Sequence, residues 1–599
     1  MPFFFKKLFL SACLPFTLFA QPSFITSLYP PQHGLNIRAD SELRVCLQAP
    51  LDPASLSDSS IYVWSDITGL HRLTVTLENG NRDLRIVPRH WRLNDRPAFN
   101  AGERATVTLT TRLRYADGRS FEGFTWHYTV AVRQGHGGVF KVEALFGGGA
   151  STYFYVSDFN GDGWCDLVGN DDGVQRKMIV FLNDQKGGIV FHHMTNITGS
   201  TGEVTDFDKD GDQDIFFGFQ RVILNDGAGN LIQRDYFDWP NGQGKAHDFN
   251  SDGKIDYVIG YVLSDTLYFG LSVNEESFKK LQKVITPLRR PIFYRHGLSY
   301  DLNNDGRIDF LYVAGTGSGV IAGFVSFEMT ASDSLKLLQI REFFYEQGSF
   351  YGNDFDGDGD IDYAFVAGGM DNYITHFNNG KGQLNPSGLQ RDPNDTRLAE
   401  AVEGGDFDGD GDMDLAFAST NTISVMPLRL APDVSIYLND GNSNFSLARR
   451  ISLPFNLPVS LVLRAIDLDR DGDLDLIGVT GNGLFYILAN GDYPNHVDDQ
   501  NSSPIPIRFS IDPIYPNPVK RSANITLHLS QNIDVETVVT VFDVTGKLIR
   551  SWRFDGRSQE IHFTWDTRDQ MSKLLPNGLY LVKAQAGTFH STQKLLLLR

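Results

Sequence analysis

Seven short stretches of the 599-residue chain place oxygen-bearing side chains at alternate positions. Each has Asp at position 1, Asp or Asn at position 3, Asp at position 5, Gly at position 6 and Asp at position 9, as in DFDGDGDIDYAF from Asp354. In a tight loop, side chains at positions 1, 3 and 5 can converge, the glycine permits a sharp turn, and position 7 can offer its backbone carbonyl. Hard oxygen ligands in this arrangement suit Ca²⁺, which takes six to eight of them.

We therefore predict about seven calcium ions, one in each loop, with ligands at positions 1, 3, 5, 7 and 9. Mg²⁺ fits less well because it demands stricter octahedral geometry, and no His or Cys at this spacing supplies the softer ligands of zinc. In chain order, the candidate metal-binding residues are Asp158, Asn160, Asp162, Trp164 and Asp166; Asp206, Asp208, Asp210, Asp212 and Asp214; Asp248, Asn250, Asp252, Lys254 and Asp256; Asp301, Asn303, Asp305, Arg307 and Asp309; Asp354, Asp356, Asp358, Asp360 and Asp362; Asp406, Asp408, Asp410, Asp412 and Asp414; and Asp467, Asp469, Asp471, Asp473 and Asp475.

Two alternatives explain the loops less well. An EF-hand ends in Glu at position 12 and lies between helices, whereas position 12 is never acidic here and the flanking residues lack a helical pattern. Acidic surface turns without metal would bring several carboxylates together, and each pair would repel by roughly 1 kcal/mol or more. Position 8 is mostly apolar, so we interpret Gln213 there as a packing variation and Cys165 as a buried apolar residue.

Short buried strands are predicted to hold these loops. After position 9 come continuous apolar runs such as YVIGY, FLYVAG and LAFAS, which are typical of strands covered on both faces. The first aspartates of consecutive loops are 48, 42, 53, 53, 52 and 61 residues apart, which indicates a repeat architecture. Each repeat can supply four strands, the content of one propeller blade. The last repeat ends after its third strand, so a spare strand at residues 137–147 could complete it.

The pattern DxDxDGxxD followed by a strand, repeated seven times, resembles the FG-GAP or VCBS repeats of integrin-α-like β-propellers. This resemblance implies one Ca²⁺ bound per blade, on loops at one rim. The expected fold class is all-β: a seven-bladed calcium-binding β-propeller over residues 137–495, flanked by N-terminal and C-terminal Ig-like β-sandwich domains.

The predicted flanking domains have alternating strand patterns. Residues 22–134 contain runs such as IYVWSD, LRIVP and ATVTLTT between turn residues, which predicts a β-sandwich. Their plan resembles the bacterial Ig-like domains that precede secreted modules. Residues 496–510 are polar and contain proline, which is typical of a linker.

Residues 511–599 contain VTVFDVTGKLI, LPNGLYLVKAQAG and KLLLL, in an order that resembles the C-terminal sorting domain of the type IX secretion system. The resemblance implies a bacterium of the Bacteroidota type, export across its outer membrane, and the type IX machinery as a partner. In that family the domain is commonly removed or joined to a surface lipid. A plain Ig-like β-sandwich is the alternative.

The N-terminus predicts entry into the secretory pathway. Residues 1–20 form a signal peptide in which Lys6 and Lys7 precede an apolar run that ends near Ala20. The sequence LSAC at residues 10–13 leaves open a bacterial lipoprotein cleavage instead. No later segment is long and apolar enough for a transmembrane span. We therefore expect a secreted or surface-attached protein.

Charge argues against nucleic acid as a partner. The net charge is −20, the 25 aspartates at positions 1, 3, 5 and 9 of the loops account for it, and no basic stripe is present. Neither H-E-x-x-H nor G-x-S-x-G occurs. His192 and His193 are adjacent in a strand-like run, so we predict that they face opposite ways.

Two function classes remain. The first is a non-enzymatic binding or adhesion module whose loops meet an unknown extracellular carbohydrate or protein. The second is an extracellular polysaccharide-degrading lyase or hydrolase, because fold alone does not decide function. A pocket of converging Lys, Arg, His or Tyr side chains apart from the seven loops would favour the enzyme.

Overall fold

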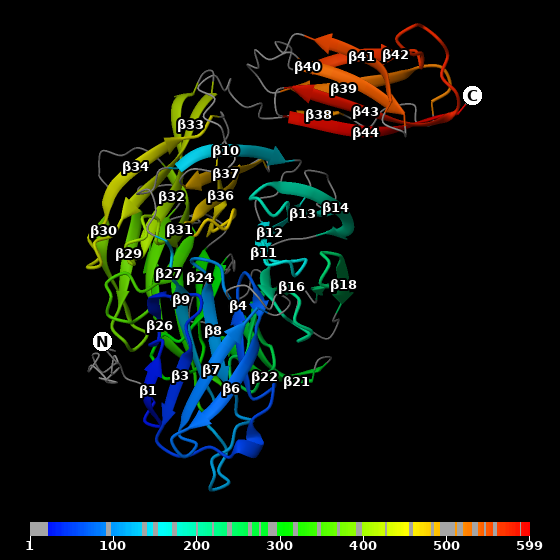
Figure 1. Cartoon of the computed structure of the whole chain (residues 1–599). Coiled ribbons are helices and arrows are strands. Elements are labelled where there is room, and N and C mark those ends of the chain that lie inside the picture. The colour runs from blue at the N-terminus through cyan, green and yellow to red at the C-terminus, as the bar shows by residue number, and fades with distance from the viewer. Residues whose placement is uncertain are drawn as a thin grey trace, which may run out of the picture.

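The computed structural model confirms an all-β fold for the part of the chain that it describes (Figure 1). The only helical element among the described residues is the short 3-10 turn η1 (Pro53–Ser55). The predicted signal peptide and most of the predicted linker lie outside these residues. The description covers residues 22–598 except 91–97, 134–139, 148–153, 171–176, 199–201, 219–220, 236–241, 261–265, 275–276, 286–295, 316–321, 344–348, 368–371, 391–397, 426–427, 455–458, 481–483, 491–508, 512–518, 530–536, 544–546, 555–559 and 587–588.

The first unit, within residues 22–133, contains two sheets that share one apolar core. The core forms because successive side chains of a strand point to opposite faces of its sheet. The strand IYVWS, for example, buries every second side chain, as half-buried strands do. Trp126 and Leu84, from different sheets, are both fully buried in this core. The sheets are β1 (Ile25–Tyr29), β3 (Leu43–Leu47), β7 (Asp83–Arg89), β6 (Arg72–Glu78); and β2 (Gly34–Ile37), β9 (Phe124–Val130), β8 (Arg104–Leu109), β4 (Ile61–Ser65), β5 (Gly69–Leu70).

Seven four-stranded antiparallel sheets follow, and we number them 1 to 7 along the chain. Their strands are β11 (Phe154–Ser157), β12 (Asp166–Asn170), β13 (Lys177–Asn183), β14 (Ile189–Thr198); β15 (Glu203–Thr205), β16 (Asp214–Gly218), β17 (Arg221–Asn225), β18 (Leu231–Asp235); β19 (Gln243–His247), β20 (Asp256–Gly260), β21 (Thr266–Asn274), β22 (Ser277–Ile285); β23 (His296–Tyr300), β24 (Asp309–Gly315), β25 (Ala322–Met329), β26 (Leu335–Phe343); β27 (Phe350–Asn353), β28 (Asp362–Ala367), β29 (Asn372–Asn378), β30 (Leu384–Gln390); β31 (Leu398–Gly405), β32 (Asp414–Val425), β33 (Leu428–Leu438), β34 (Ser446–Ser452); and β35 (Val459–Ile466), β36 (Asp475–Thr480), β37 (Leu484–Asn490), β10 (Phe140–Gly147).

The seventh sheet takes its outer strand from the beginning of the repeat region. Strand β10 pairs with β37, from Phe140 opposite Asn490 to Gly147 opposite Leu484. The prediction that the strand at residues 137–147 completes the last repeat is therefore confirmed for residues 140–147, and residues 137–139 lie outside the described ranges. The pairing ties together two segments that are far apart in sequence, as the cyan arrow beside β37 shows in Figure 1.

The strand after each loop is buried, as its apolar run predicts. Every residue of β20 and β36 is buried, whereas the fourth strand β34 exposes all but one of its seven residues. Cys165, at position 8 of its loop, is 1% exposed, which confirms its predicted apolar role.

Seven apolar clusters join the sheets in a closed series. Six clusters each link a sheet to the next one along the chain. The remaining cluster packs Phe154 and Leu167 of sheet 1 against Ile477 and Phe485 of sheet 7. Each sheet therefore shares buried apolar surface with two neighbours, which is why its middle strands are apolar on both faces.

The last unit, at residues 509–598, also contains two sheets around one core. Trp565 and Val541, from different sheets, are fully buried there. The strands are β38 (Phe509–Ile511), β39 (Ala523–Leu529), β42 (Glu560–Trp565); and β41 (Leu548–Phe554), β40 (Thr537–Asp543), β43 (Gly578–Ala586), β44 (Phe589–Leu597).

Candidate metal centres and a central cavity

Each acidic loop joins the first and second strands of one sheet, and we number the loops 1 to 7 with their sheets. The glycine at position 6 has φ between 83° and 101° in all seven loops, a conformation that side chains rarely adopt. In loop 1 the N–H groups of Asp162 and Gly163 donate to the carboxylate of Asp158 at 3.0 and 2.7 Å. In loop 5 the Gly359 N–H donates to Asp354 at 2.8 Å. The loops thus wrap around their first aspartate.

Carboxylates converge in four of the seven loops. In each group, one oxygen from each of three residues lies within 4.8 Å of the others. Position 5 joins positions 1 and 3 in two groups, and position 9 joins them in the other two. Loops 1, 3 and 4 have Asn at position 3, whose amide oxygen is also a hard ligand. The four groups are Asp206, Asp208 and Asp210; Asp354, Asp356 and Asp362; Asp406, Asp408 and Asp414; and Asp467, Asp469 and Asp471.

Several buried loop oxygens have no hydrogen-bond partner within the described protein. Both carboxylate oxygens of Asp206 and of Asp473 are in this state, as is one oxygen of Asp467. Burial raises the pKa of Asp206 to about 7, and it does the same for Asp354. Leaving buried carboxylates without donors or cations is costly. The donor set therefore fits a hard divalent cation, which would supply the missing partner.

The aspartate at position 9 has a structural role that its spacing does not reveal. In sheet 1, Asp166 accepts hydrogen bonds from the N–H of Phe159 at 3.0 Å and from the N–H of Asn183 at 2.8 Å. The same pair of bonds, to position 2 of the loop and to the end of the third strand, recurs in all seven sheets. This carboxylate therefore fixes the loop to the sheet whether or not it also binds metal.

An asparagine at the end of the third strand links neighbouring sheets, and sequence reasoning missed it. In five sheets its side-chain amide donates to the backbone carbonyl at position 2 of the preceding loop. Asn439 donates to Phe355 at 2.7 Å, and Asn183 of sheet 1 donates to Leu468 of sheet 7 at 2.9 Å. The recurring LN, FN and AN pairs that end these strands were the available signal. The other links are Asn225 to Phe159, Asn378 to Leu302 and Asn490 to Phe407.

The first unit lies directly on the loops. Tyr62 donates to the carboxylate of Asp248 at 2.8 Å, and Gln32 donates to that of Asp301 at 3.0 Å. Backbone bonds add to this contact, since the N–H of Thr125 donates to the Gly306 carbonyl at 2.8 Å. Loops 3 and 4 therefore have their first aspartate bonded from both the loop and the first unit.

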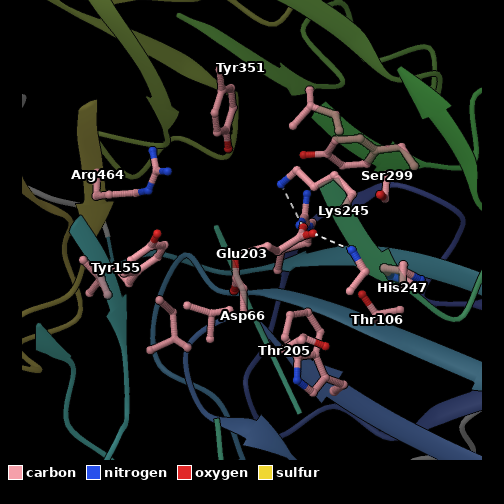
Figure 2. Close-up of a pocket in the computed structure, with 18 of the residues that line it drawn as sticks. Asp66, Thr106, Tyr155, Glu203, Thr205, Lys245, His247, Ser299, Tyr351 and Arg464 are labelled. Carbon is pink, nitrogen blue, oxygen red and sulfur yellow. Dashed lines mark hydrogen bonds and ion pairs between the residues drawn. The ribbon is translucent and has the colours of Figure 1, made fainter. Parts of the chain in front are cut away.

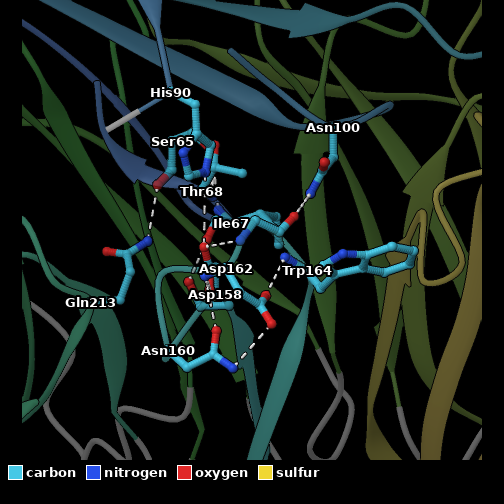
Figure 3. Close-up of polar contacts among 12 residues, drawn as sticks. Ser65, Ile67, Thr68, His90, Asn100, Asp158, Asn160, Asp162, Trp164 and Gln213 are labelled. Atoms are coloured by element: carbon cyan, nitrogen blue, oxygen red, sulfur yellow. Dashed lines mark hydrogen bonds and ion pairs between the residues drawn. The ribbon is translucent and has the colours of Figure 1, made fainter. Parts of the chain in front are cut away.

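Gln213 belongs to this interface, so its interpretation as a packing variation was wrong. It is 2% exposed, accepts a bond from the Trp64 indole N–H at 3.2 Å and donates to the Ser65 carbonyl at 3.1 Å. Figure 3 shows Gln213 directed at Ser65, and Asn100 above loop 1. Position 8 tolerates a polar side chain here because the first unit supplies its partners.

A cavity of about 350 Å³ lies between the first strands of the seven sheets and the first unit (Figure 2). Part of its wall comes from the residue three positions before the first aspartate of each loop. In ring order these are Tyr155, Glu203, Lys245, Leu298, Tyr351, Glu403 and Arg464, and all seven line the cavity. Sequence reasoning missed this ring because it concentrated on the loops.

The acids of this ring are each paired with a neighbouring cation. Lys245 donates to Glu203 at 2.9 Å, and Arg464 donates to Glu403 at 3.2 Å. Burial raises the pKa of Glu403 to about 7, although Arg464 opposes the shift. The Arg464 side chain is 45% exposed, so solvent reaches this part of the cavity.

Polar atoms without partners also line the cavity. Among the described residues these include Asp66 Oδ1, Arg104 Nε, His247 Nδ1, Ser299 Oγ and both carboxylate oxygens of Asp206. Arg104 lies with its guanidinium 4.6 Å from the centre of the Tyr300 ring. Buried polar groups normally have a hydrogen-bond partner, so these atoms point to a bound molecule or water.

The prediction that His192 and His193 face opposite ways is wrong. Their ring centres are 4.8 Å apart on β14. Phe191 pairs with Phe181 and His193 with Val180, so the register shifts at His192. Such a bulge cancels the strict alternation of a strand.

Two family models match parts of the chain. Residues 354–417 match an FG-GAP-like repeat, and residues 513–598 match a secretion system C-terminal sorting domain. The chain carries FG-GAP-like repeats and a type IX sorting domain. It is therefore an exported protein that is secreted or attached to the cell surface. No helix within the described ranges has the length and hydropathy to cross a membrane.

Comparison with solved structures found distant similarities. PorZ, a surface component of the type IX secretion system of Porphyromonas gingivalis, has 12% identity and a TM-score of 0.34, with 96% of this chain and 75% of that chain covered. The periplasmic gluconolactonase PpgL of Pseudomonas aeruginosa has 13% identity and a TM-score of 0.31, with 55% and 96% covered. Both scores are too low for an inference about this chain. No curated protein matches it.

Proposed function

We propose that this protein is an extracellular, calcium-binding, seven-bladed β-propeller flanked by two Ig-like β-sandwiches, and that it binds a carbohydrate or protein outside the cell. The closed series of seven apolar clusters supports the propeller. The converging carboxylates support calcium, with all of the predicted ligands as the proposed set. Residues 1–20 are proposed to direct the chain to the secretory pathway, and the type IX machinery is its proposed partner during export.

The observation that carries a binding role is the central cavity. It is large enough for a small ligand, and its wall combines tyrosines and other apolar side chains with charged groups that can orient a ligand. The cations Lys245 and Arg464 are each bonded to a carboxylate, so they are held in place as charged donors. This arrangement suits recognition better than proton abstraction, which needs a free base.

A polysaccharide-degrading enzyme is the second candidate, and one observation favours it. Lys245, His247, Tyr351 and Arg464 lie outside the seven loops and line a single cavity, which is the convergence expected of a catalytic site. Both candidates use the same space, so chemistry on the bound molecule separates them.

A combined screen tests the proposal. The purified full-length protein would be applied to glycan and extracellular-protein arrays, and every bound polysaccharide would be incubated and analysed by mass spectrometry for shorter products. Binding without product formation supports the binding module. New unsaturated or reducing ends would support the enzyme, and capture of neither glycan nor protein would overturn the proposed binding role.

A further inference from the structure

Positive and negative side chains are paired in the cavity wall, and this pairing limits the kind of ligand that the cavity can bind. The ring described above contains two carboxylates and two cations, and each carboxylate is bonded to the cation of the next sheet. From the first unit, Asp66 and Arg104 add one group of each sign to the lining. Outside the acidic loops, the charged residues that line the cavity therefore carry equal numbers of positive and negative charges. The loop residues Asp206, Lys209, Asp248 and Asp406 also line it, and their aspartates belong to the proposed calcium sites.

Tyrosines lie between the charged pairs. In ring order, Leu298 and Tyr351 separate the Glu203–Lys245 pair from the Glu403–Arg464 pair, and Tyr155 closes the circle. Figure 2 shows Tyr351 and Arg464 reaching from different strands into the space beside Glu203 and Lys245. Aromatic rings offer an apolar face, whereas the paired charges offer donors and acceptors at fixed places.

Unpartnered atoms mark where a ligand would bond. Asp66 Oδ1 can accept, Arg104 Nε can donate, and Ser299 Oγ can do either. Ser299 is 7% exposed, so its hydroxyl lies away from bulk water. A ligand that satisfies all three needs both donors and acceptors, and sugar hydroxyls supply both.

We propose that this cavity binds the end of a neutral carbohydrate, one or two sugar rings in size, by stacking on tyrosine and by hydroxyl bonds to the paired charges. The inference rests on the proposed binding function and assigns it a place and a ligand class. Neutrality follows from the paired charges, and the size follows from a volume of about 350 Å³, near the lower end of known ligand pockets. Figure 2 shows the side chains that would surround the sugar.

The decisive test compares how tightly neutral, anionic and cationic disaccharides bind to the protein and to variants of the cavity. The full-length protein would be titrated calorimetrically with neutral disaccharides (cellobiose, maltose and lactose), with di-galacturonate and with chitosan disaccharide. We expect one or more neutral sugars to bind more tightly than either charged one. Glu403→Gln leaves Arg464 without its carboxylate, so neutral affinity should fall about tenfold while di-galacturonate gains. Arg464→Gln should shift selectivity toward the cationic chitosan disaccharide.

Glu328→Gln is the matched control, because it breaks an exposed ion pair with Lys336 on sheet 4 and should change no sugar affinity. Melting curves and calcium counts of each variant check that the fold is kept. Tighter binding of a charged sugar by the unaltered protein, no binding of any of the sugars, or unchanged selectivity in both cavity variants would overturn the inference. If arrays still capture a glycan or protein after such a result, the proposed binding function stands and only its location and ligand class are wrong.

Discussion

At the scale of single residues, different positions of the acidic loops have different roles: some could bind metal, and one fixes the loop to its sheet. Positions 1 and 3 belong to all four convergent groups, while position 9 always bonds two backbone N–H groups. In loop 5, Asp356 accepts a bond from the N–H of Asp358 but none from outside its loop among the described contacts. Removing Asp356 should therefore affect metal binding more than folding.

We predict that Asp356→Ala lowers the number of bound calcium ions by one. Native mass spectrometry at millimolar calcium would count the ions, and the melting temperature should fall by only a few degrees, since one site of this kind adds about 0.4 to 1.4 kcal/mol. Asp235→Ala, at an exposed position of β18, should leave the count unchanged. An undiminished count in Asp356→Ala would remove this residue from the ligand set.

We predict that losing an inter-sheet asparagine lowers the free energy of unfolding more than losing one metal site does. Asn439→Ala leaves the carbonyl of Phe355 without its 2.7 Å donor inside the protein, so the free energy of unfolding should fall by about 1 to 3 kcal/mol. Urea denaturation measures this change. Asn442→Ala, in the exposed turn that follows, should cost much less. Equal effects of the two substitutions would mean that the link between sheets contributes little.

At the scale of elements, the first unit and the loops form one surface. Tyr62, Trp64 and Gln32 bond to loops 3, 2 and 4, so the unit contacts several sheets at once. The unit also supplies part of the cavity wall through β4 and β8. Its position therefore decides how large the cavity is.

We predict that Gln213→Leu loosens this contact. The substitution leaves the Trp64 indole N–H and the Ser65 carbonyl without partners, at a cost of about 1 to 3 kcal/mol. Hydrogen exchange should become faster in β4, measured by mass spectrometry of peptides that cover residues 61–70. Gln233→Leu, on the outer strand β18, provides the comparison. Unchanged exchange in β4 would show that Gln213 does not hold the unit in place.

At the scale of the whole molecule, the ring of sheets should depend on its ions. Extracellular calcium modules bind with Kd of about 10⁻⁴ to 10⁻³ M, so seven similar sites at roughly 1 mM calcium would add about 3 to 10 kcal/mol. That sum is comparable with the net stability of a domain. Chelation should therefore lower the melting temperature of the ring strongly. The last unit contains no such loop and should respond little in the same calorimetric scan. Identical scans with calcium and chelator would refute the proposed metal role.

Export of the whole molecule should depend on its C-terminal domain. Deleting residues 511–599, which include the matched sorting domain, should trap the protein in the periplasm. Fractionation of the producing cells measures this, with the calcium-dependent melting of the truncated protein as a check on folding. Unchanged appearance of the truncated protein outside the cell would mean that export uses another signal.

The sequence by itself determined the features that depend on neighbours along the chain. The loop turn needs only residues within nine positions, which is why the glycine at position 6 and the buried strand that follows were predictable. The repeat made the number of sheets countable, and the missing last strand pointed to residues 137–147. Local spacing also indicated which oxygens could converge.

The tertiary structure alone decided the features that join distant residues. Gln213 resembled a packing variation until Trp64 and Ser65, almost 150 residues earlier, were found to bond to it. The bulge at His192 arises from register with β13, which no local pattern specifies. The cavity needs one residue from each of seven strands, and each is unremarkable in its own repeat. Its balanced charges exist only because the closed series of sheets brings Glu203 to Lys245 and Glu403 to Arg464.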